Sequence, residues 1–228
     1  MPTAVVTGAN SGIGNAFAQV LIREGYDVTA VDINVGEGLE ALSCKTMQFD
    51  VTSPESIRSC VASYGDGPLD LLLNVAGIMV HPDEDSLTTV SLETLTKSFK
   101  INTFGPLLVA QAFLPNLLKS EKPKIGVVTS RFGSIADNSS GGSYAYRASK
   151  SAVNSVFKNL AVDLKGQGVV VVIMHPGIVR TPMTSMLREI PGSVGPMEAA
   201  EELWVVVKGK GLDETGRFWH RNGLELPW

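Results

Sequence analysis

Short and almost uniformly apolar runs recur along the chain, separated by longer segments of mixed polarity. The runs are Thr3–Thr7, Asp27–Asp32, Thr46–Asp50, Leu69–Asn74, Ile125–Ser130 and Val169–His175, with a last short one at Gly216–His220. Runs that lack a polar alternation are typical of strands covered on both faces, as in a parallel sheet. The pattern therefore predicts a parallel sheet buried between helices.

The segments between the runs predict the helices. These are Gly12–Glu24, Gly36–Leu42, Pro54–Ser63, Leu92–Lys119, Ser143–Lys165 and Met197–Lys208. Strands that alternate with helices at this spacing indicate βαβ crossovers and an open parallel sheet. No Pro/Gly/Ser-rich linker and no repeat divides the chain, so residues 1–228 are expected to form one domain, a three-layer, doubly wound α/β/α fold.

Composition and charge narrow the classes of partner. The 228 residues are 44% hydrophobic, which is enough for one sizeable core, and the net charge is -4. A weakly acidic chain gives no electrostatic reason to expect nucleic acid or an anionic membrane surface as partner. Neither a targeting segment nor an apolar run of the ~20 residues that span a membrane is evident, so we expect a cytoplasmic protein. Cys44 and Cys60 have no metal-ligand spacing, and no metal is expected.

A glycine-rich turn follows the first predicted strand and opens the first predicted helix. Its sequence is TGANSGIG, from Thr7 to Gly14. In a dinucleotide-binding turn Gly8 makes the sharp bend, Gly12 lets the backbone approach a pyrophosphate, and Gly14 lets helix and strand pack closely. The pyrophosphate then rests on the helix N-terminus, where free N–H groups favour an anion. Any tight strand-to-helix turn favours glycine, so the turn by itself leaves a purely structural explanation open.

Asp32 ends the second predicted strand, 18 residues after Gly14. An acid at this place in a Rossmann-type fold hydrogen-bonds the adenosine ribose hydroxyls. The same carboxylate repels a 2′-phosphate, and no Lys or Arg stands in the glycine-rich turn or directly after Asp32 to neutralise one. The sequence therefore predicts NAD as cofactor and makes NADP the less favoured one.

A tyrosine and a lysine share one face of the predicted helix Ser143–Lys165. Tyr146 and Lys150 are four residues apart, which is about one helical turn. A phenol with a pKa near 10 is a poor acid or base at neutral pH, and a neighbouring ammonium group favours its phenolate form. A tyrosine and a lysine four residues apart often occur by chance, so a catalytic interpretation depends on other motifs in the chain.

Several such motifs occur together and in order along nearly the whole chain. They are Thr7–Gly14, Asp32, Asp50-Val51, the NVAG segment Asn74–Gly77, Asn102, a serine before the tyrosine, Tyr146–Lys150 and the PGIVRT segment Pro176–Thr181. In this order they resemble the short-chain dehydrogenase/reductase family in its short, single-domain form. The residues from Gly133 to Lys150 and the ending Leu226-Pro227-Trp228 are most similar to its sniffer-like and C-factor-like carbonyl reductases.

The resemblance implies a role for each matching residue. Tyr146 exchanges a proton with the substrate oxygen, Lys150 lowers the pKa of Tyr146 and holds the nicotinamide ribose, and Asn102 fixes a water that links Lys150 to solvent. A serine hydrogen-bonds the substrate oxygen. The resemblance also implies a set of dinucleotide-binding residues: Gly8, Ser11, Gly12, Ile13, Gly14, Asp32, Asp50, Val51, Asn74, Ala76, Gly77, Tyr146, Lys150, Pro176, Gly177, Ile178 and Thr181.

The serine has two candidates. The family's serine usually lies about a dozen residues before the tyrosine and is followed after two residues by a glycine. Ser130 has that local context but precedes Tyr146 by 16 residues, whereas Ser134 precedes it by 12 but lies beyond Gly133. We favour Ser130 and assign the surplus residues to a loop over Asp137–Gly142, which is rich in turn formers.

The expected function is that of an NAD-dependent oxidoreductase for a ketone, aldehyde or alcohol. A dinucleotide-sensing regulatory protein with little turnover is the alternative that the C-factor resemblance allows, and a nucleotide-sugar epimerase is a weaker third. Residues 182–196 are expected to form a substrate lid, whose Met183, Met186, Leu187 and Ile190 favour an apolar or aromatic substrate. Apolar residues beyond one stripe on the two long helices predict a homodimer or homotetramer.

Overall fold

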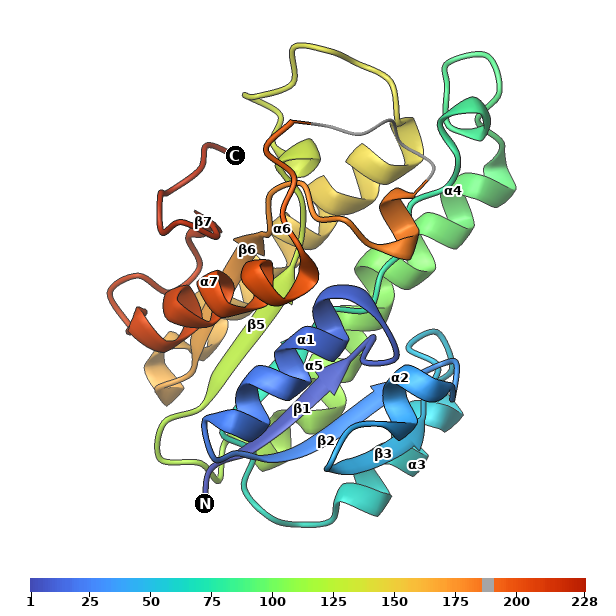
Figure 1. Cartoon of the computed structure of the whole chain (residues 1–228). Helices are drawn as coiled ribbons and strands as arrows, with labels where there is room; N and C mark the ends of the chain where they lie inside the picture. Colours follow the sequence, from blue (N-terminus) through green and yellow to red (C-terminus); the bar gives the residue numbers. More distant parts are fainter. Residues whose placement is uncertain (186–190) are drawn as a thin grey trace.

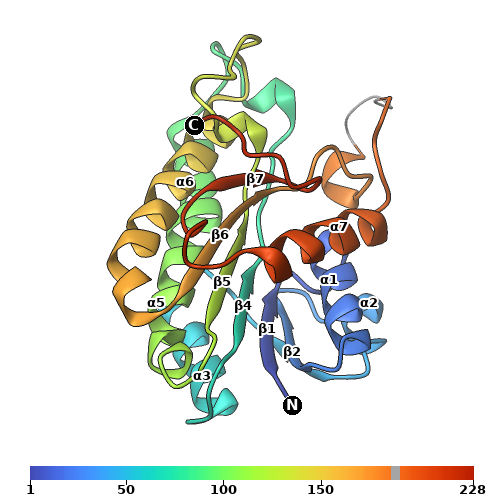
Figure 2. The ribbon, with the colours of Figure 1, turned by 90° about the vertical axis from the view of Figure 1, so that its left-hand side faces the viewer.

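The computed structural model describes residues 1–185 and 191–228. Within these residues, seven parallel strands form one sheet in the order β3-β2-β1-β4-β5-β6-β7. Helices cover both faces of this sheet (Figures 1 and 2). The predicted doubly wound α/β/α fold is confirmed.

The elements follow the predicted alternation closely. The strands are β1 (Thr3–Thr7), β2 (Asp27–Asp32), β3 (Lys45–Gln48), β4 (Leu71–Asn74), β5 (Lys124–Val128), β6 (Val170–His175) and β7 (Phe218–His220). The helices are α1 (Gly12–Arg23), α2 (Glu37–Glu40), α3 (Pro54–Tyr64), α4 (Leu92–Phe99), α5 (Gly105–Leu117), α6 (Tyr144–Leu164) and α7 (Pro196–Gly209). The clearest differences lie at strand ends, since β3 stops at Gln48 and β5 stops at Val128.

The uniform polarity of the runs has a direct structural cause. Figure 2 shows α3, α5 and α6 on one side of the sheet and α1, α2 and α7 on the other. Successive residues of a strand point to opposite faces. In β1, Ala4 and Val6 accordingly enter the core beneath α1 and α7, whereas Val5 enters the core beneath α5 and α6. Both faces are buried, so the three central positions of the strand, Ala4 to Val6, are all apolar.

The predicted helix Leu92–Lys119 is interrupted. Between α4 and α5 the backbone widens into a π-helical segment, η2 (Lys100–Phe104), that contains Asn102. The side chain of Asn102 is 1% exposed and points inward to other polar groups. Segments of this kind often lie at functional sites, and here the extra width turns an amide into the interior.

The strand order creates a crevice beside β1. The chain builds β2 and β3 on one side of β1 and then crosses to β4 on the other. At such a switch point the loops after neighbouring strands separate at the carboxyl edge, which is where ligands of open α/β sheets bind. Gly8 after β1 and Ala76 after β4 face each other there, and a Cβ at Gly8 would lie 2.8 Å from the Ala76 Cα.

Candidate active site

A cleft of about 420 Å³ lies along the carboxyl edge of the sheet. Sixteen of the residues expected to bind the dinucleotide or to act in catalysis line it: Gly8, Ser11, Gly12, Ile13, Gly14, Asp32, Asp50, Val51, Ala76, Gly77, Ser130, Tyr146, Lys150, Pro176, Gly177 and Thr181. Asn74, Asn102 and Ile178 do not line it. The fold thus brings residues from seven separate segments of the chain into one site.

The glycine-rich turn has a backbone that only glycine tolerates easily. Gly8 and Gly12 have φ values of +72° and +57°, in the left-handed region. A Cβ at Gly14 would lie 2.1 Å from the carbonyl oxygen of Gly8, so α1 packs directly against the end of β1. Ser11 begins α1 without a side-chain cap, which leaves first-turn N–H groups free to meet an anion. These features fit a dinucleotide pyrophosphate.

Asp32 is held in place at the end of β2. Its two carboxylate oxygens accept hydrogen bonds from the backbone N–H groups of Asn10 and Asn34, each at 2.9 Å. A carboxylate has about four acceptor positions, so both oxygens keep capacity for ribose hydroxyls. The nearby cleft wall is formed by Asp50 and Thr52, and the Asp50 carboxylate accepts from the N–H and the hydroxyl of Thr52. No Lys or Arg side chain is among the described residues that line this end.

Lys150 lies in the interior of the site, one turn along α6 from Tyr146. Its side chain is 5% exposed, and Nζ donates to the carbonyl oxygen of Val128 at 3.1 Å. Nζ also lies 5.8 Å from the centroid of the Tyr146 ring. Burial disfavours the ammonium form and lowers the pKa of Lys150 to about 8. Close to neutral pH this amine therefore titrates far more readily than a surface lysine.

Two opposing influences act on the pKa of the Tyr146 hydroxyl. Burial raises the pKa of Tyr146 above its usual value, and a hydrogen bond with the Ser130 side chain opposes that rise. Burial also lowers the pKa of Lys150, which makes its ammonium group a stronger acid than that of a surface lysine. That Lys150 lowers the pKa of Tyr146 stays a prediction. At neutral pH the phenol is protonated and can donate.

The two candidate serines have different surroundings. Ser130 follows the end of β5 and begins a short 3₁₀ turn, η3 (Arg131–Gly133), where its Oγ accepts from the Phe132 N–H at 3.2 Å. It lines the cleft beside Tyr146. Ser134 is 1% exposed, lies outside the cleft lining, and its Oγ accepts from the Asp137 N–H at 3.1 Å. The geometry favours Ser130 as the partner of Tyr146.

Asn102 acts on the site from behind the cleft wall. Its Oδ1 accepts from the Ile78 N–H at 2.8 Å, and its Nδ2 donates to the Ile78 carbonyl and to the Ser149 hydroxyl, both at 3.0 Å. It thereby ties the loop after β4 to α6. Of the other two residues outside the cleft, Asn74 is buried with both amide atoms unpartnered among the described residues, and Ile178 is 41% exposed.

Several cleft residues were not predicted from the sequence. They are Ile33, Asn34, Phe49, Thr52, Ile78, Ile101, Val128, Thr129 and His175. Most of them are sequence neighbours of a predicted residue, so their closeness to the motifs was the signal that could have identified them. Val75 and Val179 lie within the predicted segments Asn74–Gly77 and Pro176–Thr181, and Pro182, Met183 and Thr184 belong to the predicted lid. Of the predicted lid, Met186, Leu187 and Ile190 lie outside the described residues.

His175 is the titratable member of this unpredicted set. It ends β6, is 9% exposed, and its ring centroid lies 5.4 Å from that of His220. Burial, with the charges of His220 and of two nearby arginines adding to it, lowers the pKa of His175 to about 3. The imidazole is therefore neutral at physiological pH and is not a proton donor to substrate there.

We expect His175 to weaken the fold at low pH. Its pKa is lowered in the folded chain, so the unfolded chain binds more protons between about pH 6.5 and 3. The free energy of unfolding should therefore fall as the pH drops through this window, by up to ~1.4 kcal/mol per pH unit from this group. Urea unfolding at pH 7, 6 and 5 measures the slope.

His175→Asn should flatten that slope relative to the unchanged chain. His81→Asn is the matched control, because the His81 side chain is 48% exposed and should leave the slope as it is. Equal slopes for the chain and for His175→Asn would show that the buried imidazole does not resist protonation.

Membrane and metal partners depend on features of the helices and of the acidic, His and Cys side chains. No described helix combines the length and the apolar character needed to cross a bilayer. The His, Cys, Asp and Glu side chains described form no group of three or more suited to hold a metal ion.

A dinucleotide cradle at the switch point and a Ser–Tyr–Lys set in the same cleft define an α/β protein of the dinucleotide-binding class. The family model "short chain dehydrogenase" matches residues 2–191. The chain is 36% identical to 1-hydroxy-2-glutathionyl-2-methyl-3-butene dehydrogenase of Rhodococcus sp. (strain AD45), with all of both chains covered. It is 36% identical to C-signal of Myxococcus xanthus over 75% of this chain and all of that protein.

Solved structures agree over the full length. The NADPH-bound carbonyl reductase from chicken fatty liver superposes with a TM-score of 0.92 at 29% identity, covering 100% of this chain and 99% of that one. The carbonyl reductase Sniffer of D. melanogaster has a TM-score of 0.90 at 28% identity, with all of both chains covered. The chain belongs to the short-chain dehydrogenase/reductase family. It is an oxidoreductase of this family, which uses a nicotinamide dinucleotide on alcohol or carbonyl groups.

Proposed function

We propose that this protein interconverts apolar or aromatic carbonyl compounds and their alcohols with NAD(H). The observation that carries the proposal is the meeting of Ser130, Tyr146 and Lys150 in the cleft bordered by the glycine-rich turn. In reduction the Tyr146 hydroxyl gives its proton to the carbonyl oxygen, while the Ser130 hydroxyl hydrogen-bonds the same oxygen. Lys150 holds the nicotinamide ribose. The bound nicotinamide supplies the hydride, and the protein supplies orientation and electrostatics.

The protonated state of Tyr146 supports its role as proton donor in the reductive direction. A general acid must carry its proton at the working pH and reach the reacting oxygen. Burial keeps the pKa of Tyr146 above its usual value, so the proton is present at neutral pH. Oxidation needs the same hydroxyl to lose its proton first, and we expect it to be faster at alkaline pH.

The substrate class is inferred from the cleft wall. Apolar side chains of Ile78, Val179 and Met183 line it, and Phe132 contacts the Tyr146 ring edge-on with centroids 6.2 Å apart. Such a wall favours an apolar or aromatic body with a single polar group at the catalytic end.

A substrate panel tests the proposal. Aromatic and aliphatic ketones and aldehydes, and alcohols including 1-hydroxy-2-glutathionyl-2-methyl-3-butene, are offered with NAD(H) and followed by NADH absorbance. Saturable turnover supports the enzyme. The similarity to C-signal favours the second candidate, a dinucleotide-sensing protein with little turnover. Tight NADH binding without turnover of any panel member would favour that candidate instead.

We predict that NAD(H) binds at least tenfold more tightly than NADP(H), a difference of ~1.4 kcal/mol. The reason is Asp32, whose carboxylate accepts ribose hydroxyls but repels a 2′-phosphate. The solved carbonyl reductase from chicken fatty liver holds NADPH, and a Burkholderia multivorans neighbour holds NADP, so family membership alone does not decide this preference. Fluorescence titration of both reduced dinucleotides measures it.

Asp32→Ala should narrow the difference between the two dinucleotides. Asp27→Ala is the matched control, since Asp27 is an exposed acid at the opposite end of the same strand. Equal or inverted affinities in the unchanged chain would overturn the preference for NAD(H).

Location and assembly stay predictions of the sequence. We expect a cytoplasmic homodimer or homotetramer. Exposed apolar side chains on the outer helices support the assembly: Val162 on α6 is 65% exposed and Phe104, next to α5, is 50% exposed. Related surfaces in closed oligomers pair across two-fold axes.

A further inference from the structure

Asp85 is a buried carboxylate that the reaction described above does not use. It lies in the segment between β4 and α4 and is 2% exposed. Its Oδ1 accepts from the backbone N–H of Ala145 at 2.7 Å, and its Oδ2 accepts from that of Tyr146 at 3.0 Å. The partners are 60 and 61 residues away along the chain. A buried acid thus bonds directly to the main chain of the proton donor.

These two bonds replace a cap that α6 lacks. The residue before the helix, Ser143, has φ 49°, in the left-handed region, and its side chain caps nothing. The first N–H groups of a helix have no partner within it and favour an acceptor with negative charge. Helices usually find this acceptor in the residue that begins them. Here it comes from a distant loop, so the position of the first turn of α6 depends on that loop.

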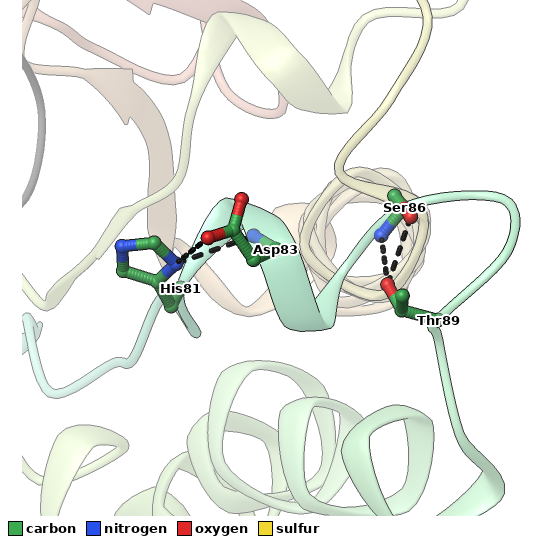
Figure 3. Close-up of polar contacts among 4 residues, drawn as sticks. All are labelled: His81, Asp83, Ser86 and Thr89. Atoms are coloured by element: carbon green, nitrogen blue, oxygen red, sulfur yellow. Dashed lines mark hydrogen bonds and ion pairs between the residues drawn. The ribbon is translucent and has the colours of Figure 1, made fainter.

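The loop around Asp85 is shaped by local hydrogen bonds, which Figure 3 shows. Before it, His81 Nδ1 accepts from the Asp83 N–H at 3.3 Å and begins the short turn η1 (Pro82–Glu84). After it, the Ser86 N–H donates to Thr89 Oγ1 at 3.3 Å, and the two hydroxyls are 2.8 Å apart. Asp85 sits between two closed turns, so the direction of its carboxylate is fixed.

The segment between β4 and α4 that holds Asp85 also lines the dinucleotide cleft, at the end where it leaves β4. Val75 to Ile78 line the cleft, and Asn102 holds the backbone of Ile78 through both its N–H and its carbonyl. Seven residues later the chain arrives at Asp85. One stretch of backbone therefore contacts the cofactor side of the site and the helix that carries Tyr146.

We propose that Asp85 is a positioning residue for Tyr146. By holding the Ala145 and Tyr146 N–H groups, it sets the depth and rotation of the first turn of α6, and so the place of the phenol in the cleft. The inference rests on the proposed function in one respect, the use of Tyr146 as proton donor. Misplacing a reacting group by about 1 Å can cost as much as ~100-fold in rate.

The test compares Asp85→Ala with Asp85→Asn. Asp85→Ala should lower the single-turnover rate of NADH oxidation by at least about tenfold, measured with 4-nitrobenzaldehyde as probe carbonyl. Asp85→Asn keeps one acceptor oxygen and should recover part of the rate. The NADH dissociation constant should change less than about twofold in both variants, because no cleft-lining residue is altered.

Ser91→Ala is the matched control. Ser91 ends the same loop and caps α4, where its Oγ accepts from the Thr94 N–H at 3.1 Å. Its loss should lower the melting temperature by a few degrees, as expected for a lost cap, and leave the rate unchanged. An unchanged rate in Asp85→Ala, or an equal loss of rate in Ser91→Ala, would overturn the inference.

Hydrogen exchange separates this inference from the proposed function. If the unchanged protein reduces no panel carbonyl, the proposed function fails, but amide exchange over residues 144–150 still reports on Asp85. Faster exchange there in Asp85→Ala with NADH bound, and not in Ser91→Ala, supports the positioning role. Equal exchange in all three proteins excludes it.

Discussion

Tyr146→Phe is expected to lower kcat for carbonyl reduction by about 1000-fold. Proton transfer from a placed side chain contributes roughly 100- to 10,000-fold to such reactions. Phenylalanine removes the hydroxyl and keeps the ring, so the edge-on contact with Phe132 at 6.2 Å is retained. The change should therefore act on the chemical step and leave the fold intact. Steady-state rates with saturating NADH measure it.

Tyr144→Phe supplies the matched control for this prediction. Tyr144 begins α6 two residues earlier, is 41% exposed and does not line the cleft, so loss of its hydroxyl should leave kcat unchanged. NADH affinity should stay within about twofold in both variants. A Tyr146→Phe protein that keeps more than a tenth of the rate would remove Tyr146 from the proton-donor role.

The sheet was predictable because each strand is marked by its own run of apolar residues, and the same pattern recurs along the chain. Strands buried on both faces are mostly apolar without a polar alternation. β1 and β2 begin and end at the predicted residues, Thr3–Thr7 and Asp27–Asp32. The predictions were wrong where a strand leaves the sheet. Val128 ends β5 although no glycine or proline follows it at Thr129 or Ser130, because the chain turns there into the cleft.

Features set by contacts distant in sequence were not predictable. The run Leu92–Lys119 was interpreted as one helix although Gly105 and Pro106 lie within it, and Pro106 has no N–H to bond the carbonyl of Asn102. The hydrogen bonds of Asn102 to Ile78 and Ser149 were not visible in the sequence. Asp85 does not belong to any sequence motif either. Its proposed role depends on hydrogen bonds from two backbone N–H groups of α6, about 60 residues away in the chain.

The candidate site was predictable in part, less fully than the sheet and more fully than the contacts between distant residues. Motif residues such as Gly8 and Lys150 identified the cleft, because backbone approach and buried amines restrict which residue types fit. His175 was visible before Pro176, but only the fold shows that it lines the cleft with its neutral imidazole buried. The loop between β5 and α6 left Ser130 and Ser134 open, since spacing and local context favoured different residues.

Ser130→Ala should lose about 100-fold or more in kcat, with NADH affinity nearly unchanged. A donor to the reacting oxygen typically contributes ~100- to 1000-fold. Ser130 lines the cleft and hydrogen-bonds with Tyr146, so its hydroxyl can reach an oxygen that the phenol also reaches. Ser134→Ala should lose less than about tenfold, because its Oγ accepts from the Asp137 N–H and does not face the cleft. Each variant is compared at saturating NADH, with melting temperature as the check on folding. An inactive Ser134→Ala beside an active Ser130→Ala would assign the donor role to Ser134 and place the extra loop residues before it, while leaving the family membership unaffected.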